Sequence, residues 1–147
     1  MSTKTTDELK HEIQAAADIE DYLRNNDENM LRQSLSEHLN GLLEQKGISR
    51  ADVVRGSLLD RVYVYQIFSG EKTPSRDKLI AIVFGLGLSD EEAQKMLKLS
   101  GNRELYPRDE RDALILFVLQ KQGKIAEVND LLDSHGLATL GVTDNLR

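Results

Sequence analysis

The segment from Gly47 to Lys78 constrains the fold of this chain more than any other part of the sequence. Ser49 and Asp60 are residue types that favour the N-cap of a helix, and Gly70 is the type that most often follows a helix C-terminus. A tight break separates the two predicted helices at residues 56–59. The pattern therefore predicts two short helices packed across each other, which is a helix-turn-helix. The inward side chains are expected to be Val53, Val54, Val64, Ile67 and Phe68.

The same segment resembles the Cro and phage-repressor type of helix-turn-helix transcription regulators, also called the xenobiotic-response-element family. The resemblance covers residues 35–88. It implies an all-α fold, with a lambda-repressor-like five-helix bundle and a DNA-reading helix over residues 60–69. The features that carry it are Gly47-Ile48-Ser49, Val53-Val54, the set Leu59, Val64 and Ile67, and Gly70-Glu71-Lys72-Thr73-Pro74-Ser75.

Three departures from the family pattern bear on the fold. The turn position that is usually glycine is Leu58, so the turn must be made differently, with help from Gly56. The glutamine that often begins the second helix is replaced by Arg50. The family often pairs an arginine late in the first helix with a glutamate late in the recognition helix. At these two positions this chain has Leu43 and Phe68, and the joint change predicts an apolar contact in the core.

Helical periodicity continues on both sides of this segment. Thr5 and Glu8 form a capping-box signature near the N-terminus. We expect helices over residues 6–24, 29–46, 75–86 and 90–99. The expected organisation is an acidic N-terminal helix or arm (1–28), the helix-turn-helix bundle (29–101), a C-terminal helical extension (102–136) and a flexible tail (137–147).

The C-terminal extension contains seven consecutive apolar residues, from Ala113 to Leu119. Pro107 suits the first position of the helix that carries them. Because a helix that is apolar on all sides must be buried on all sides, this run either packs under the bundle or joins a second copy of the chain. We expect a homodimer, supported by the segment Asp112–Leu132.

The net charge of −6 is unevenly distributed. Residues 1–30 carry three basic and eight acidic side chains, whereas residues 31–100 carry ten basic and nine acidic ones. The acidic segment is interpreted either as an arm that meets DNA or a partner, or as a helix that packs on its own domain or is frayed in solution. Its charge disfavours DNA. A local positive face remains possible around the helix-turn-helix, so that DNA affinity must rest on placed contacts more than on bulk charge.

The leading hypothesis is a sequence-specific regulator that binds double-stranded DNA and reads the major groove. The predicted recognition helix directs four side chains outward, which are expected to contact bases: Arg61, Val62, Tyr65 and Gln66. Four residues near helix starts are expected to hold phosphates: Arg50, Lys72, Thr73 and Arg76. The alternative is that this face is an ordinary solvated surface, or that the fold serves as a protein-interaction module of the adaptor or antitoxin type.

Other classes of function are disfavoured by the sequence. No nucleophile motif, phosphate loop or metal-ligand spacing is present, so we expect no enzyme activity, no cofactor and no metal. His11, His38 and His135 are not spaced as ligands. The chain has no cysteine, no apolar run long enough to span a membrane and no N-terminal signal pattern, which predicts a cytoplasmic protein without a membrane partner.

Overall fold

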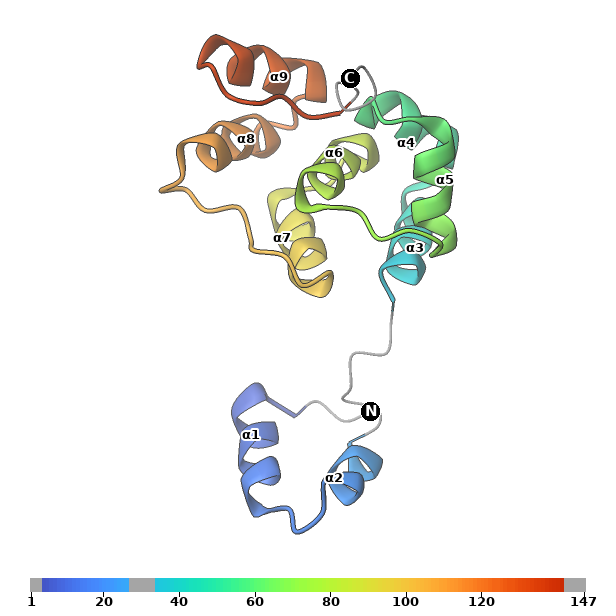
Figure 1. Cartoon of the computed structure of the whole chain (residues 1–147), viewed down its shortest axis with the longest axis vertical. Coiled ribbons are helices and arrows are strands. Elements are labelled where there is room, and N and C mark those ends of the chain that lie inside the picture. The colour runs from blue at the N-terminus through green and yellow to red at the C-terminus, as the bar shows by residue number, and fades with distance from the viewer. Residues whose placement is uncertain (1–3, 27–33, 142–147) are drawn as a thin grey trace. The chain divides into compact units, whose positions relative to one another are not determined.

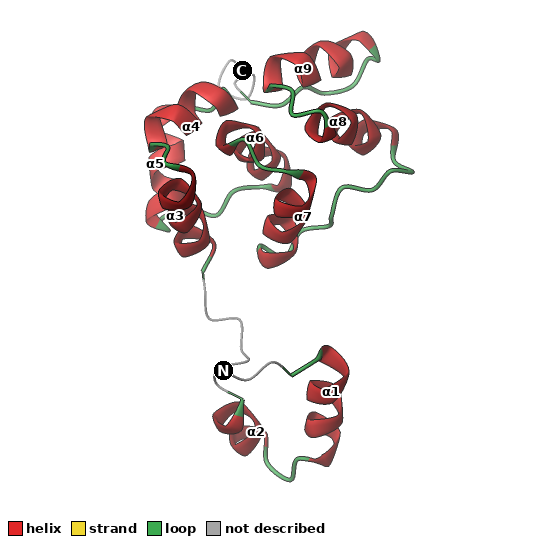
Figure 2. Cartoon of the chain, turned by 180° about the vertical axis from the view of Figure 1, so that it is seen from behind, coloured by secondary structure: helices red, strands yellow, loops and turns green. Residues whose placement is uncertain are grey.

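In the computed structural model, residues 4–26 and 34–141 are described. This part of the chain forms nine α-helices and contains no strand, so the prediction of an all-α fold is confirmed. The chain divides into two compact units, residues 1–34 and 35–147 (Figures 1 and 2). The helices are α1 (Thr6–Ala15), α2 (Ile19–Asn25), α3 (Leu35–Lys46), α4 (Arg50–Ser57), α5 (Arg61–Ser69), α6 (Arg76–Leu86), α7 (Asp90–Leu99), α8 (Glu110–Gln120) and α9 (Ile125–Ser134).

The N-terminal unit holds two helices where the sequence predicted one helix over residues 6–24. Its first helix begins with the predicted capping box, in which the Thr5 side chain accepts a hydrogen bond from the backbone of Glu8. The prediction failed because Asp18 caps a new helix, accepting from the backbone N–H of Glu20 at 3.1 Å. The buried Asn26 ties the two helices together, since it accepts from Lys4 at 2.8 Å and donates to Glu12, on α1, at 2.7 Å.

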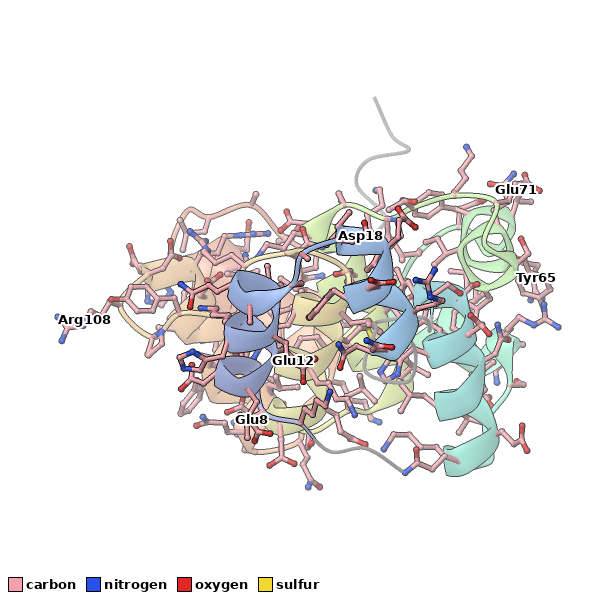
Figure 3. All side chains as sticks on the ribbon, turned by 90° about the horizontal axis from the view of Figure 1, so that it is seen from below. Glu8, Glu12, Asp18, Tyr65, Glu71 and Arg108 are labelled. Atoms are coloured by element: carbon pink, nitrogen blue, oxygen red, sulfur yellow. The ribbon has the colours of Figure 1, made fainter. Side chains whose placement is uncertain are left out.

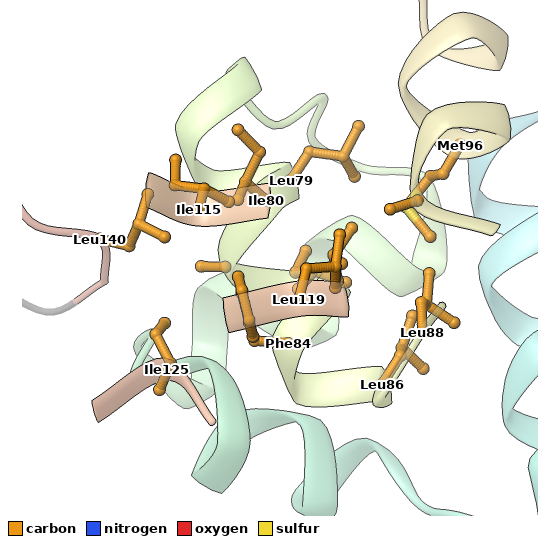
Figure 4. Close-up of a cluster of buried hydrophobic side chains, with 14 of the residues drawn as sticks. Leu79, Ile80, Phe84, Leu86, Leu88, Met96, Ile115, Leu119, Ile125 and Leu140 are labelled. Atoms are coloured by element: carbon orange, nitrogen blue, oxygen red, sulfur yellow. The ribbon is translucent and has the colours of Figure 1, made fainter. Parts of the chain in front are cut away.

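In the second unit, α6 is the central helix and contacts α4, α7 and α9 (Figures 1 and 2). A helix that is apolar on every side requires cover on every side, and α6 receives it. Figure 4 shows side chains of α6 packed with those of α7, α8 and α9. The buried residues of α6 are Leu79, Ile80, Ala81, Ile82, Val83, Phe84 and Leu86.

Two glycines set the distance between α4 and α6. A Cβ atom added to Gly56 would lie 2.9 Å from the Cα atom of Gly85. A Cβ atom added to Gly85 would lie 2.8 Å from the carbonyl oxygen of Val53 and 3.2 Å from the Cβ atom of Ser57. Both positions are too close for any side chain, so the two backbones are in direct contact. The expected role of Gly56 in the turn is therefore wrong: this residue permits helix packing instead.

Leu58 itself makes the turn between α4 and α5. It adopts the left-handed conformation, with φ 61° and ψ 21°, at the position where the family pattern has glycine. A residue with a side chain is strained in this conformation by about 1–2 kcal/mol. The surroundings hold it in place, since Ser57 Oγ accepts from the backbone N–H of Leu59 at 3.2 Å and Gly141 packs on the Cβ atom of Leu58.

The predicted caps of the following helices are present. Asp60 caps α5, accepting from the backbone N–H of Tyr63 at 3.3 Å, and Ser75 caps α6. Gly70 ends α5 with φ 86°. The inward side of α5 is formed by Val64, Ile67 and Phe68, which are all buried. Leu43 packs half-buried against the core that contains Phe68, and a direct contact between these two side chains stays a prediction.

The expected C-terminal extension belongs to the same core as the bundle. Ile115, Leu119 and Leu132 are buried in one cluster with Leu39 and Phe68. The structure places residues 35–147 in one compact unit. The expected boundary at residue 28 lies outside the described residues. Residues 29–33 of the helix predicted over residues 29–46 lie outside the described residues.

The expected flexible tail from residue 137 is corrected in its first part. Leu140 is 1% exposed, and its backbone exchanges two hydrogen bonds with the side chain of Asn129, at 2.8 and 2.9 Å. Arg111 donates to the carbonyl of Ala138 at 3.0 Å. These contacts fix residues 137–141 on the core, whereas residues 142–147 lie outside the described part of the chain.

Two details of α8 also differ from expectation. The helix begins at Glu110, because Asp109 caps it by accepting from the backbone of Asp112 at 2.9 Å, and Pro107 lies in the preceding turn. The run from Ala113 to Leu119 is not covered on all sides. Ile115, Leu116, Val118 and Leu119 are buried, but Phe117 is 57% exposed.

We predict that Gly85→Ala destabilises the protein by about 1–3 kcal/mol, because the new methyl group forces the backbones of α4 and α6 apart. Gly41→Ala is the matched control, since Gly41 lies inside α3 with nothing within 4 Å of an added Cβ atom. This control should stabilise the protein by roughly 0.5–1 kcal/mol. Urea unfolding measures both free energies. Equal stability of Gly85→Ala and the parent would contradict the close contact.

Helix caps also lower several carboxyl pKa values. The backbone N–H of Ser49 donates to Asp52, and that of Ser89 donates to Glu92, so both acids have a pKa below the ordinary value. The backbone of Asp112 lowers the pKa of Asp109 in the same way. As the pH falls, these carboxylates become protonated in the unfolded chain before they do so in the folded protein. The stabilisation is therefore present above their ordinary pKa values and is lost as the pH falls through their lower pKa values in the folded protein.

We therefore predict that the free energy of unfolding is constant with respect to these groups above about pH 5.5 and falls below about pH 4. Glu92→Gln should flatten part of this decline, because it removes one of the lowered pKa values. Glu91→Gln, next to it but outside the capping box, is the control and should keep the decline. Urea unfolding over a pH series gives the slopes, and identical slopes for both variants would argue against the capping assignment.

Candidate nucleic-acid interface

The outward side of α5 gathers the four side chains that the sequence predicted for base contacts. Together with Arg50, at the start of α4, they line one open, shallow groove of about 420 Å³. The inward side of the same helix is anchored in the core, so the outward side has a fixed direction. The groove is lined by Arg50, Arg61, Val62, Tyr65, Gln66, Ser69 and Glu71.

Tyr65 is the centre of the positive part of this groove. The guanidinium carbon of Arg50 lies 5.2 Å from the centre of the Tyr65 ring, and that of Arg61 lies 5.9 Å from it. Arg61 also donates a hydrogen bond to the Tyr65 hydroxyl at 3.4 Å. Both guanidinium groups interact favourably with the face of the ring, so Tyr65 holds two positive charges from different helices close together on the surface.

Val62 and Tyr65 make the groove partly apolar. Val62 is 63% exposed and Tyr65 is 37% exposed, although they belong to the larger apolar or aromatic residue types. Exposed apolar surface is unfavourable in water, so these side chains suit contact with an apolar group of a ligand, such as a thymine methyl.

Two residues of this groove, Ser69 and Glu71, were not predicted from the sequence, and Glu71 is the charged one. Its carboxylate accepts a hydrogen bond from the Gln66 amide at 3.0 Å, and its backbone N–H donates to the Gln66 carbonyl at 2.9 Å. Figure 3 shows the side chains of Tyr65 and Glu71 at the same edge of the molecule. The turn after Gly70 folds the chain back onto α5. In the sequence, Gly70 was the available signal for this turn and so for the position of Glu71.

The predicted phosphate ligands divide into two groups. Lys72 and Thr73 are exposed just after α5, and the backbone N–H of Lys72 donates to the Gln66 carbonyl at 3.2 Å, next to the groove. Arg76 does not join them. Its guanidinium donates to both carboxylate oxygens of Asp112, at 3.2 and 2.9 Å, and to the carbonyl groups of Arg103 and Glu104. Arg76 therefore links α6 to α8. Its guanidinium is engaged in these contacts, so Arg76 does not act as a phosphate ligand in this arrangement.

A second ion pair runs beside the first with the charges exchanged. Arg111, on α8, donates to both carboxylate oxygens of Asp77, on α6, at 2.8 and 3.1 Å. Consecutive residues of α6 thus pair with consecutive residues of α8, one arginine and one aspartate from each side. Asp112 is 1% exposed, so its ion pair with Arg76 also compensates a buried negative charge.

Comparisons with models of protein families, with curated proteins and with solved structures found no match. Within residues 4–26 and 34–141, no group of three histidine, aspartate or glutamate side chains is placed to hold a metal ion. In the same described residues, no helix combines the length and apolar character needed to cross a bilayer.

We predict that Arg76→Ala lowers the free energy of unfolding by about 3 kcal/mol, because it leaves Asp112 buried with much of its charge unpaired. Lys72→Ala is the control for loss of a basic side chain near the groove, and it should change stability by less than about 0.5 kcal/mol. Thermal or urea unfolding of both variants measures the difference. An Arg76→Ala protein as stable as Lys72→Ala would mean that the buried pair contributes little.

Proposed function

We propose that this protein is a transcriptional regulator that binds double-stranded DNA in a sequence-specific manner and places α5 in the major groove. The single observation that supports this proposal most is the outward side of α5. It presents Arg61, Val62, Tyr65 and Gln66 together on a helix whose opposite side is locked in the core. We further propose that α3 to α7 form a lambda-repressor-like five-helix bundle with α4 and α5 as its helix-turn-helix.

The side chains of α5 match the chemistry of base edges in the major groove. An arginine such as Arg61 can donate two hydrogen bonds to the O6 and N7 atoms of guanine, and Gln66 can pair with the N6 and N7 positions of adenine. In the free protein the Gln66 amide donates to Glu71. Binding adenine therefore requires that the hydrogen bond from Gln66 to Glu71 be exchanged for hydrogen bonds to the base.

Phosphate contacts would come from Arg50 and from the turn after α5. Arg50 lies in the first turn of α4, where the helix N-terminus itself favours an anion. Lys72 and Thr73 follow the groove residue Glu71 in the sequence and are exposed. The net charge of −6 does not oppose this use, since eight of the acidic side chains lie in residues 1–30.

Selection of bound duplexes from random DNA with the purified protein tests the proposal. We expect recovery of a defined motif, and a two-fold symmetric one if the protein acts as a homodimer. Binding to the recovered duplex should weaken steeply with salt, because each neutralised phosphate releases counterions. Recovery of no motif, at low salt as well as at physiological salt, would refute the proposed function.

We predict that Arg61→Ala and Gln66→Ala each reduce discrimination between the recovered site and its single-base variants by about 1–3 kcal/mol. Arg50→Ala and Lys72→Ala should instead weaken binding to all duplexes and lower the slope of affinity against salt. Glu91→Ala, on α7, is a control outside the groove. Fluorescence anisotropy measures these affinities, and variants that all bind like the parent would place the DNA contact elsewhere.

A protein-interaction module is the second candidate, and Glu71 is the observation that favours it. A carboxylate inside the groove repels phosphate, and exposed Val62 and Tyr65 suit a protein partner as well as DNA. The two functions differ in the effect of Glu71→Gln. Removing this negative charge should strengthen DNA binding, because it reduces repulsion of the backbone. If the partner is a protein that forms an ion pair with Glu71, the same substitution should weaken its binding.

A further inference from the structure

The solvent side of α8 is apolar where a surface helix is normally polar. The buried apolar residues of this helix, Ile115, Leu116, Val118 and Leu119, face the core. On the opposite side, five residues at helical spacing form one stripe, because positions three, four, seven and eleven residues apart share a face. The stripe consists of Glu110, Ala113, Leu114, Phe117 and Lys121.

Phe117 is the largest exposed part of this stripe. It is 57% exposed, and Ala113 and Leu114 beside it are half-buried. Lys121 lies with its ammonium 5.0 Å from the centre of the Phe117 ring and forms an ion pair with Glu127 at 2.6 Å. An exposed phenylalanine on a helix that already contributes four buried residues to the core is not needed for folding of its own chain.

The order of charges along the stripe makes it complementary to itself. Glu110 and Lys121 lie at its two ends, equally far from the point midway between Leu114 and Phe117. When a second α8 runs antiparallel across this point, Leu114 meets Phe117 of the other copy and Glu110 meets Lys121 of the other copy. Both contacts occur twice, as a two-fold interface requires. The small side chain of Ala113 lets the two helices approach.

We propose that a second copy of this chain covers the stripe, and that the homodimer forms through antiparallel packing of α8 against α8. The inference specifies the homodimer expected with the proposed function, but it does not depend on DNA binding. One helix pair buries less surface than a standard interface, so the free protein should dimerise with a dissociation constant on the order of 10 μM. Lys121 keeps its contact with Glu127, since an ammonium group has three donors.

The test uses the full chain without DNA, in sedimentation velocity experiments over a concentration series. Phe117→Glu should raise the dissociation constant roughly a hundredfold or more, because it removes the apolar centre from both sides of the interface. Ile13→Glu is the matched control: Ile13 is 49% exposed in the N-terminal unit, so the same change of charge there should leave the dissociation constant unchanged. Circular dichroism should show that both variants stay folded.

Charge exchange distinguishes this antiparallel arrangement from any other dimer. Glu110→Lys places like charges at both ends of the stripe, and Lys121→Glu does the same with the opposite sign, so each variant alone should dimerise about threefold to tenfold more weakly. A mixture of the two variants restores both unlike pairs and should dimerise as the parent does. The double variant, with both substitutions in one chain, should also recover.

Four results would overturn the proposal. The first is a parent protein that is monomeric at hundreds of micromolar (an order of magnitude above the expected constant). The second is a Phe117→Glu protein that dimerises like the parent. The third is weakening by Ile13→Glu equal to that by Phe117→Glu, which would show that the effect of Phe117→Glu is not specific to the stripe on α8. The fourth is a mixture of the charge variants that stays as weak as its components. Because no DNA is present, each result leaves the proposed DNA binding to be judged by its own experiment.

Discussion

The direct contact between the backbones of α4 and α6, at Gly56 and Gly85, is the constraint on which the second unit depends. α6 is the buried centre of the unit. Because no side chain separates α4 from α6 at this contact, the position of α4 on α6 is closely fixed. α5 follows α4 through a turn at Leu58 that is strained into the left-handed conformation. The direction of the outward side of α5, and with it the whole candidate interface, is therefore set by two glycines that are not part of that interface.

The C-terminal third of the chain holds the same arrangement from the other side. Arg76 and Asp77, at the start of α6, pair with Asp112 and Arg111 at the start of α8. Further along, Gly141 packs on the turn at Leu58. Residues that follow α7 in the sequence thus hold both the central helix α6 and the turn between α4 and α5. Removal of this part would expose the buried side chains of α6, so the second unit is expected to fold only as a whole.

Local sequence signals predicted the local structure well. The caps at Ser49, Asp60 and Ser75 mark where α4, α5 and α6 begin, because the hydrogen bonds of a cap involve residues within one turn. The four outward residues of α5 follow from helical periodicity in the same way. Two local caps were missed, at Asp18 and Asp109, and they shift the boundaries of α1, α2 and α8. The other failures depend on contacts between distant residues. Arg76 is a residue type that often binds phosphate and it lies near a helix start, so the sequence favoured that role. Its ion pair with Asp112, 36 residues further along the chain, becomes visible only in the structure.

The same reasoning explains the other errors. Gly56 was expected to help with the turn, because glycine permits unusual backbone angles. The contact with Gly85 depends instead on its lack of a side chain. The run from Ala113 to Leu119 has no polar residue to mark its exposed side, so periodicity did not identify Phe117 as exposed. Docking of Leu140 relies on the side chain of Asn129, and neither residue has a distinctive pattern around it.

The proposed reading surface is tested most directly by nuclear magnetic resonance of the isotope-labelled full chain, titrated with a duplex recovered by selection. The largest changes in backbone and side-chain amide signals should occur at Arg61, Gln66 and Glu71, and at Arg50 in the first turn of α4. Amides of α9, which lies outside the groove, should change little. Changes confined to residues outside α4, α5 and the turn after α5 would contradict the assignment of α5 as the helix that reads DNA.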